Sequence, residues 1–192
     1  MKLPVELWVR LRIIDLVAQT ARITLADKLD FGGRLFGLAH YWYWAMDAEG
    51  ERAPSVLDEI DRAIRFDSAF TNQNKHVYRL ACGSEPPRGD LALERDYATE
   101  SEAAGRVAVD CLVREKGLNR ETAYAARLNG RLRGAKVSNM KCGEVWRIVV
   151  SAPSERSALA EVDRMLVSRS RREGLLLNPH YQGYEVIGVK RP

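Results

Sequence analysis

Few residues in this sequence have the types and spacing that catalysis or metal binding requires. The three histidines, His40, His76 and His180, have no carboxylate, cysteine or second histidine at the spacing of a metal site, so we expect structural or surface roles for them. No P-loop, dinucleotide-binding glycine motif, nucleophile elbow or pair of catalytic carboxylates is present. The residues themselves therefore predict no catalytic site, no metal and no cofactor.

Two Asp-Arg pairs, Asp61-Arg62 and Asp163-Arg164, stand in similar sequence surroundings. They could form a charged binding face. They could equally be solvated helix positions whose ion pairs are worth about 0–1 kcal/mol each, and we favour this second interpretation.

A run of aromatic residues at 41–44, Tyr-Trp-Tyr-Trp, is the most conspicuous candidate for ligand binding. Aromatic side chains on a four-stranded sheet stack RNA bases in one class of RNA-binding domain. The basic-Gly-aromatic signature of that class is absent, and Trp44 recurs as Trp146 without its aromatic neighbours. We therefore interpret these tryptophans as sheet core or as an interface between halves, whereas exposure of Trp42 or Trp44 would favour RNA binding.

One motif occurs twice in the chain. Residues 57–62, Leu-Asp-Glu-Ile-Asp-Arg, return at 159–164 as Leu-Ala-Glu-Val-Asp-Arg, a spacing of 102 residues (159 − 57). Each copy is followed by an Asn-x-x-x-x-x-Tyr tail, and the two tails are spaced by 106 residues (178 − 72). The four additional residues amount to about one helical turn, which a helix can absorb while its buried side stays the same.

The spacing of 102 also extends upstream, where it pairs Val5 with Val107, Leu7 with Val109 and Trp44 with Trp146. Repetition on this scale predicts two related halves. We place them at 1–82 and 105–192, joined by an acidic, Pro- and Gly-containing connector at 83–104 in which 91–97 is a candidate short helix.

Hydrophobic periodicity predicts the same elements in each half. In the first, alternation predicts a strand at 5–13. Asp15 is the expected N-cap of a helix at 16–29, whose expected buried side carries Leu16, Ile23 and Ala26 at helical spacing. The second helix, which starts at 53–55, is expected to bury Leu57, Ile60 and Ile64. The remaining predicted elements are two strands as a hairpin within 35–48, a closing strand within 70–80, a strand at 107–113, a helix from Asn119 to about 131, a hairpin of 136–141 and 144–150 that turns at Cys142-Gly143, a helix from 154 to Gly174 and a strand at 184–189.

These patterns predict the fold class α+β, with two tandem βαββαβ, ferredoxin-like halves. The simplest packing places both helices of a half on one face of an antiparallel sheet. Such a sheet has open edges that favour pairing, so we expect the halves to form a pseudo-dimer within one chain.

The composition fits a folded protein with a solvated surface. The 192 residues carry a net charge of +4 and a pI near 9.0, without a dense block of Lys or Arg that would indicate nucleic acid. Three widely spaced cysteines suggest neither a zinc site nor disulfides. Together with the charged N-terminus and the absence of a long apolar run, this predicts a cytoplasmic protein without a membrane segment.

The tails and the opening strand resemble a known family. Residues 175–184, Leu-Leu-Leu-Asn-Pro-His-Tyr-Gln-Gly-Tyr, resemble the closing Leu-Leu-x-Asn-Pro-x-x-x-x-Tyr of PurS, the small subunit of phosphoribosylformylglycinamidine synthase. Residues 5–12 resemble the start of PurS and of the PurS-like region of larger synthetase chains, and 72–76, Asn-Gln-Asn-Lys-His, resemble the end of that region. The first tail departs from the family at Gln73, where the family has proline. The candidate partner-contact or structural residues are Asn72, Lys75, His76, Tyr78, Asn178, Pro179 and Tyr184, together with Trp44 and Trp146.

This resemblance implies a role in purine biosynthesis. PurS proteins are βαββαβ units that dimerise, have no catalytic residues, and bridge a glutaminase subunit to an ATP-dependent synthetase subunit, so that ammonia passes between them. The chain would then be a fused PurS dimer, a non-catalytic subunit of a C-N ligase whose partners are those two subunits, with further homo-oligomerisation left open. A tandem ligand- or RNA-binding module is the alternative, and an autonomous enzyme the third.

Overall fold

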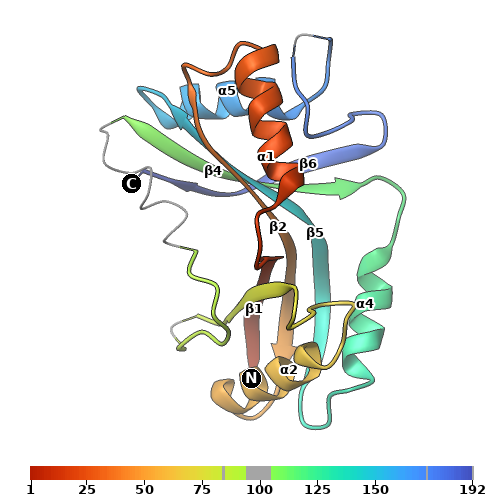
Figure 1. Ribbon diagram of the computed structural model, residues 1–192. Coiled ribbons are helices and arrows are strands. Elements are labelled where there is room, and N and C mark those ends of the chain that lie inside the picture. The colour runs from red at the N-terminus through yellow and green to blue at the C-terminus, as the bar shows by residue number, and fades with distance from the viewer. Residues whose placement is uncertain (84, 94–104, 172, 192) are drawn as a thin grey trace. The chain divides into compact units, whose positions relative to one another are not determined.

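The computed structural model describes residues 1–83, 85–93, 105–171 and 173–191, which fold as an α+β protein (Figure 1). None of the helices in this part of the chain has the length and apolarity needed to span a bilayer. The helices are α1 (Leu16–Ile23), which continues into the π-helical turn η1 (Thr24–Lys28), α2 (Ala53–Arg65), α4 (Arg120–Asn129) and α5 (Glu155–Leu166). The strands are β1 (Lys2–Leu11), β2 (Leu35–Glu49), β3 (His76–Ala81), β4 (Arg106–Glu115), β5 (Lys136–Ser151) and β6 (Gln182–Lys190).

The strands form a six-stranded sheet in the order β3-β1-β2-β5-β4-β6. β1 pairs antiparallel with both β2 and β3, and β4 pairs antiparallel with both β5 and β6. The predicted class, α+β with an antiparallel sheet, is therefore confirmed.

The chain divides into two compact units, and each unit takes segments from both of the predicted halves. Unit 1 consists of Met1–Ile13, Trp42–Ala92 and Gly117–Gly143, and unit 2 of Ile14–Tyr41, Leu93–Lys116 and Glu144–Pro192. Unit 1 therefore contains α2 and α4, and unit 2 contains α1 and α5. The predicted halves, 1–82 and 105–192, are each continuous in the sequence. Each compact unit, in contrast, is built from three separate segments.

The two predicted hairpins are wrong. β2 and β5 are continuous strands of 15 and 16 residues, and the predicted turn at Cys142-Gly143 lies inside β5, where Gly143 has no positive φ. At about 3.3 Å per residue, each strand is about 50 Å long. Because residues 35–41 and 144–151 belong to unit 2, and 42–49 and 136–143 to unit 1, each long strand supplies a segment to both units.

Unit 1 has its core between β1 and its two helices. α2 begins with a proline in its first turn, and its predicted buried side is confirmed, since Leu57, Ile60 and Ile64 are all 0% exposed. Full burial of such a side chain stabilises the fold by about 1.5–3 kcal/mol. The cluster also includes Val5, Leu7 and Val9 from β1, Trp44 and Met46 from β2, and Leu128 from α4.

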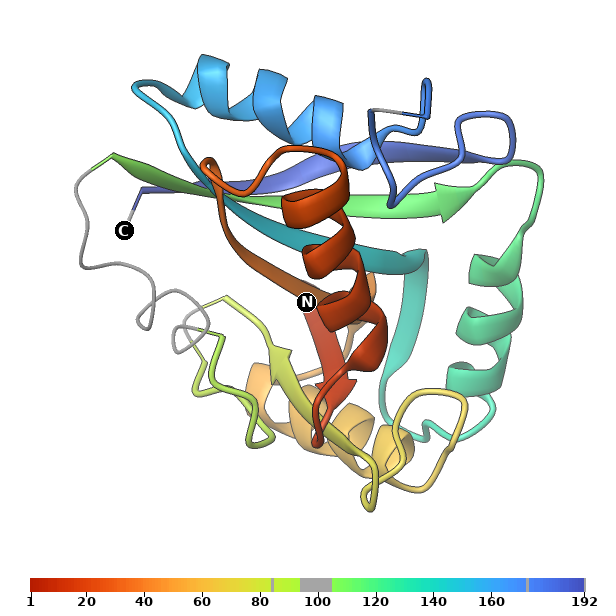
Figure 2. The same cartoon turned by 45° about the horizontal axis from the view of Figure 1, so that its top comes forward.

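Unit 2 packs α1 and α5 on one face of β4 (Figure 2). The predicted N-cap is confirmed, because the Asp15 side chain accepts hydrogen bonds from the backbone N–H groups of Val17 and Ala18. The predicted buried side of α1 is wrong: Leu16 and Ile23 are exposed, and Ala18, Ala21 and Leu25 are buried instead. Ala18, Ala21 and Leu25 are themselves at helical spacing, i, i+3 and i+7, so the segment is amphipathic along a different side from the predicted one.

The helix α5 ends at Leu166, well before the predicted end at Gly174. Val167 leaves the helix in extended conformation and forms a parallel bridge with Leu177. The backbone N–H groups of Leu176 and Leu177 both donate to the carbonyl of Leu166, at 3.0 and 2.9 Å. The chain therefore turns back at this helix end, because a second segment satisfies its last carbonyl groups.

Residues 85–92 of the connector belong to unit 1 and are hydrogen-bonded to β3 rather than lying free at the surface. Leu80 on β3 and Arg88 exchange backbone hydrogen bonds of 2.9 and 2.8 Å, and Leu91 donates to the Tyr78 carbonyl at 2.9 Å. Leu91 is buried. Residues 94–97 of the predicted short helix lie outside the described residues, and 91–93 are not helical.

The strand register corrects the sequence alignment of the repeat. Leu7 lies opposite Trp44, and Cys111 lies opposite Trp146. The tryptophans are spaced by 102 residues (146 − 44), but their partners by 104 (111 − 7). Leu7 therefore corresponds to Cys111 and not to the predicted Val109. Val5, opposite Met46, likewise corresponds to Val109, which lies opposite Ile148, and not to the predicted Val107. The spacing falls from 104 to 102 in the stretch that contains η1.

Candidate functional site

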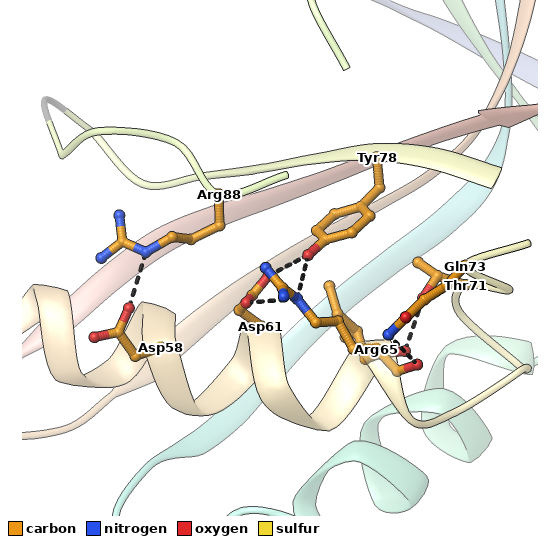
Figure 3. A network of polar contacts seen from close by, with 8 residues as sticks. Asp58, Asp61, Arg65, Thr71, Gln73, Tyr78 and Arg88 are labelled. Carbon is orange, nitrogen blue, oxygen red and sulfur yellow. Dashed lines mark hydrogen bonds and ion pairs between the residues drawn. The ribbon is translucent and has the colours of Figure 1, made fainter. Parts of the chain in front are cut away.

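The repeated aspartate of α2 forms the centre of a polar network with the first Asn-to-Tyr tail (Figure 3). The Tyr78 hydroxyl, carried by β3, donates to Asp61 Oδ1 at 2.5 Å. Arg65, one turn after Asp61 on α2, donates from Nε to the Tyr78 hydroxyl at 2.7 Å and lies 2.9 Å from Asp61 Oδ2. Asp61 is buried, so the expectation that it is a solvated helix position is wrong.

The tail begins with a tight turn that Asn72 organises. The Asn72 side-chain oxygen accepts from the Asn74 backbone N–H at 3.1 Å, and the Asn72 N–H donates to His76 Nδ1 at 3.1 Å. The backbone N–H groups of Lys75 and His76 donate to the Asn72 carbonyl. Asparagine suits this position because its side chain hydrogen-bonds the backbone two residues on.

The tyrosine–aspartate and arginine–aspartate contacts recur in the second tail. The Tyr184 hydroxyl donates to Asp163 Oδ1 at 2.8 Å, and Arg169 lies 2.7 Å from Asp163 Oδ2. Arg169 follows Asp163 by six residues, whereas Arg65 follows Asp61 by four. The two arginines are therefore not at equivalent positions, although each places a guanidinium group against the aspartate. Tyr184 is 37% exposed, against 7% for Tyr78, and the second network is therefore the more solvated.

The second turn also repeats the first. Asn178 Oδ1 accepts from the His180 N–H at 3.1 Å, and the Asn178 N–H donates to Gln182 Oε1 at 2.9 Å. Lys116 Nζ donates to the Pro179 carbonyl at 2.6 Å. In the first tail Arg12 reaches the corresponding carbonyl, that of Gln73, at 3.5 Å. The two Asn-to-Tyr tails thus have one local design, in which Gln182 takes the place of His76.

The pKa shifts in the two networks favour protonation states that keep the hydrogen bonds formed. Burial and the hydrogen bond to Asp61 raise the pKa of Tyr78 to about 12, and burial and Asp163 raise the pKa of Tyr184 to about 12. Both phenols are therefore protonated hydrogen-bond donors at neutral pH. Burial, with the charge of Lys75, lowers the pKa of His76, which keeps its Nδ1 free to accept from Asn72.

A groove of about 390 Å³ opens beside this network in unit 1. Gly89, at its rim, has a φ of +92°, and a Cβ there would collide with the Tyr78 carbonyl. Arg12 lies 3.4 Å from Asp90 across part of the groove. The other side chains that line it are Arg65, Gln73, His76 and Tyr78.

The repeated tryptophans are core residues. Trp44 is 5% exposed and contacts the rings of Phe70 and Tyr124, with centroids 5.6 Å apart in both cases. Trp146 is 4% exposed and lies against His40, with centroids 4.6 Å apart. Trp42 is half-buried against His76, at 5.2 Å. The prediction of sheet core is confirmed for Trp44 and Trp146, which have no ring face free for a base.

The structure brings some of the candidate residues together and separates others. Asn72, His76 and Tyr78 converge on one turn and strand, Lys75 extends from the same turn as an exposed side chain, and the second tail repeats the pattern with Asn178, Pro179 and Tyr184. Sequence reasoning missed the aspartates as partners of the tyrosines. The signal was present, since the Asp-to-Tyr separations are 17 and 21 residues, and the difference equals the four-residue gain between motif and tail.

Among the described residues, no group of three or more His, Cys, Asp or Glu side chains is arranged to hold a metal ion. Comparison with models of known protein families, with curated proteins and with solved structures finds no match for this chain.

Proposed function

We propose that this chain is a fused pair of PurS-like modules that serves as a non-catalytic structural subunit of phosphoribosylformylglycinamidine synthase in cytoplasmic purine biosynthesis. In this role it bridges the glutaminase subunit to the ATP-dependent synthetase subunit, and nucleic acid and membrane are not partners. Free ammonia protonates and diffuses away, so the two active sites must be held together while ammonia passes between them.

The observation that carries the proposal is the double occurrence of the tail contacts. The residues that resemble the PurS ending, Asn178 and Tyr184, build a turn and tie a strand to α5, and Asn72 and Tyr78 do the same with α2. The family motif therefore has a structural explanation in both copies, as expected for a subunit whose family conserves architecture rather than catalysis.

The composition of the compact units supports the pseudo-dimer within this proposal. Unit 1 combines α2 with α4, and unit 2 combines α5 with α1, so each unit takes one helix from each predicted half. If two copies exchange a helix in this way, each compact unit is completed by residues of the other copy. Fusion into one chain removes the concentration dependence that a pair of separate subunits would have.

The proposal is tested by reconstitution with the glutaminase and synthetase subunits from the same genome. We expect the three proteins to co-purify, and amidine formation from glutamine to require this chain. Amidine formation from added ammonium salt should proceed without it, because the synthetase then needs no bridge.

A surface variant tests whether the first turn contacts a partner, and two outcomes would contradict the proposal. Lys75→Glu reverses an exposed charge in the first turn without removing any hydrogen bond within the described residues, so it should weaken co-purification only if this turn contacts a partner. Full glutamine-dependent activity without the chain, or no co-purification of the unmodified chain, would overturn the proposal.

A further inference from the structure

A second and larger groove lies in unit 1, between the exposed side of α2 and the loop that follows α4. Its volume is about 860 Å³, within the range of pockets that hold small organic ligands. The α2 wall carries Arg62 and Phe66, and the loop wall, residues 130–134, carries Arg133. Neither wall belongs to the Asp61–Tyr78 network.

The carboxylates of the groove are already engaged by the protein. Glu59 accepts from the backbone N–H groups of Arg133 and Gly134, and Asp58 pairs with Arg88 at 2.8 Å. The guanidinium groups of Arg62 and Arg133 are exposed, and neither has an ion pair or hydrogen bond with any described residue. The groove therefore offers two free cations and no free anion.

Phe66 adds an apolar surface to these cations. It follows the last turn of α2 as the C-cap residue, and its side chain is 74% exposed. Its ring lines both this groove and a neighbouring one. It is suited to stack on the ring of a ligand, which is worth about 1–3 kcal/mol for a nucleic-acid base.

The corresponding place in unit 2 is filled by the protein itself. At the spacing of 102 residues, Arg133 corresponds to Phe31 and Arg62 to Arg164. Phe31 is 1% exposed, and the Arg34 and Arg164 guanidinium carbons lie 5.4 and 5.7 Å from the centre of its ring. Arg34 also pairs with Glu161, the counterpart of Glu59, at 2.9 Å.

The comparison shows that the fold does not require an open groove here. In unit 2 an aromatic ring lies between cations, and Arg164 is held by Glu161 and Glu173 at 3.5 Å. In unit 1 the ring is replaced by an arginine, which leaves a space lined by unpaired cations. We propose that this groove binds a small ligand with a planar ring and a phosphate group, such as a nucleoside monophosphate.

In this assignment each group of the ligand has a named partner. The phosphate is bound by Arg62 and Arg133, because guanidinium groups match phosphate oxygens through paired hydrogen bonds. The ring stacks on Phe66 and takes the place that Phe31 occupies in unit 2. The inference is independent of the bridging role, since it concerns the exposed side of α2 and not the tails.

Calorimetric titration of the full chain with AMP tests the proposal, with adenosine, inorganic phosphate and a short single-stranded RNA as comparison probes. We expect AMP to bind with a Kd below about 1 mM, and adenosine and phosphate each to bind at least about tenfold more weakly. Arg62→Ala and Arg133→Ala should each weaken AMP binding by about tenfold or more.

Two further variants separate binding from folding. Arg133→Phe copies Phe31 and should abolish AMP binding while the circular dichroism spectrum stays unchanged. Arg156→Ala removes an exposed arginine of α5 that has no partner among the described residues, so it should leave binding unchanged.

No heat of binding with AMP at several times that concentration would overturn the proposal. So would equal affinity for AMP and inorganic phosphate, which would remove the role of the ring. Tighter binding of the RNA than of AMP would overturn the assignment to a free nucleotide.

Discussion

Tyr78 and Asp61 are joined by a hydrogen bond of 2.5 Å that ties the edge strand β3 to the middle of α2. The two residues lie 17 positions apart in the sequence, and both are buried. A buried carboxylate is unfavourable unless hydrogen bonds satisfy it. The tyrosine and Arg65 therefore make it possible for Asp61 to face the sheet.

Tyr78→Phe should lower the free energy of unfolding by about 1–3 kcal/mol, because hydrogen bonds to charged groups are worth about that much and Asp61 remains buried. Urea denaturation at pH 7 measures the change. Tyr184→Phe is the matched control, and its effect should be smaller, since Tyr184 is 37% exposed. Equal effects of the two variants would contradict this account.

Gly89→Ala should release the connector from the edge of β3. Gly89 has a φ of +92°, and a Cβ at this position would meet the Tyr78 carbonyl that Leu91 bonds. We expect faster amide hydrogen exchange at Leu80 and Leu91, which lose their partners. Gly83→Ala is the control, because it has a φ of +53° but open space around it, so it should show only backbone strain of about 1 kcal/mol and unchanged exchange at Leu91.

Arg147→Met should be strongly destabilising. The Arg147 guanidinium is buried in unit 2 and forms a two-pronged ion pair with Asp110, with distances of 2.7 and 3.0 Å. Removing one partner of a buried pair costs about 3–5 kcal/mol, because the other charge stays in place. The double variant Arg147→Met with Asp110→Leu should recover part of the loss in chemical denaturation, and a double variant less stable than the single one would refute this interpretation.

His40 should make the stability of the protein fall as the pH rises above 6.5, the ordinary pKa of histidine. Burial alone would lower the pKa of His40, but Glu144 and Asp15, which face its two ring nitrogens at 3.6 and 3.1 Å, outweigh burial and raise it. A raised pKa means that the folded state favours the charged form, so the stabilisation is fully present below the ordinary value of 6.5 and is lost as the pH rises through the folded value. Unfolding free energies measured from pH 5 to pH 9 should show this decline in the parent protein and not in His40→Gln.

Asp67 should make the stability of the protein fall at acid pH. Its carboxylate is fully buried and accepts from Arg127 and Arg131 of the α4 region, at 2.6 and 2.9 Å. Burial would raise the pKa of Asp67, but Arg127, the Ala69 N–H and Arg131 together lower it. The stabilisation is present above the ordinary value of 3.8 and is lost as the pH falls below it. Asp67→Asn should be less stable at pH 7 and should lose less stability on acidification, and a parallel acid profile for both proteins would contradict this.

Local patterns in the sequence predicted what depends on nearest neighbours. The buried side of α2, Leu57, Ile60 and Ile64, follows from helical spacing alone, and the caps Asp15 and Asn119 follow from side chains that bond the backbone two or three residues on. The strand predicted at 107–113 is likewise observed within β4. These features need no distant partner.

The register of the repeat escaped sequence reasoning for a physical reason. Successive side chains of a strand alternate between faces, so a shift of two residues leaves every side chain on the same face. The alternation of buried and exposed side chains is therefore matched equally well whether Leu7 is paired with Val109 or with Cys111. Only the cross-strand neighbours, Trp44 and Trp146, distinguish them.

By itself the sequence determined the repeated motifs, the helices and the α+β class, because these rest on periodicities that act over a few residues. The tertiary structure decided which segments share a compact unit, that β2 and β5 run straight through the predicted turns, and that Asp61 is buried. It also decided that the groove beside Arg133 is open while Phe31 is covered. A polar side chain is solvated or buried according to partners that lie far away in the chain, and no local pattern records where those partners will be.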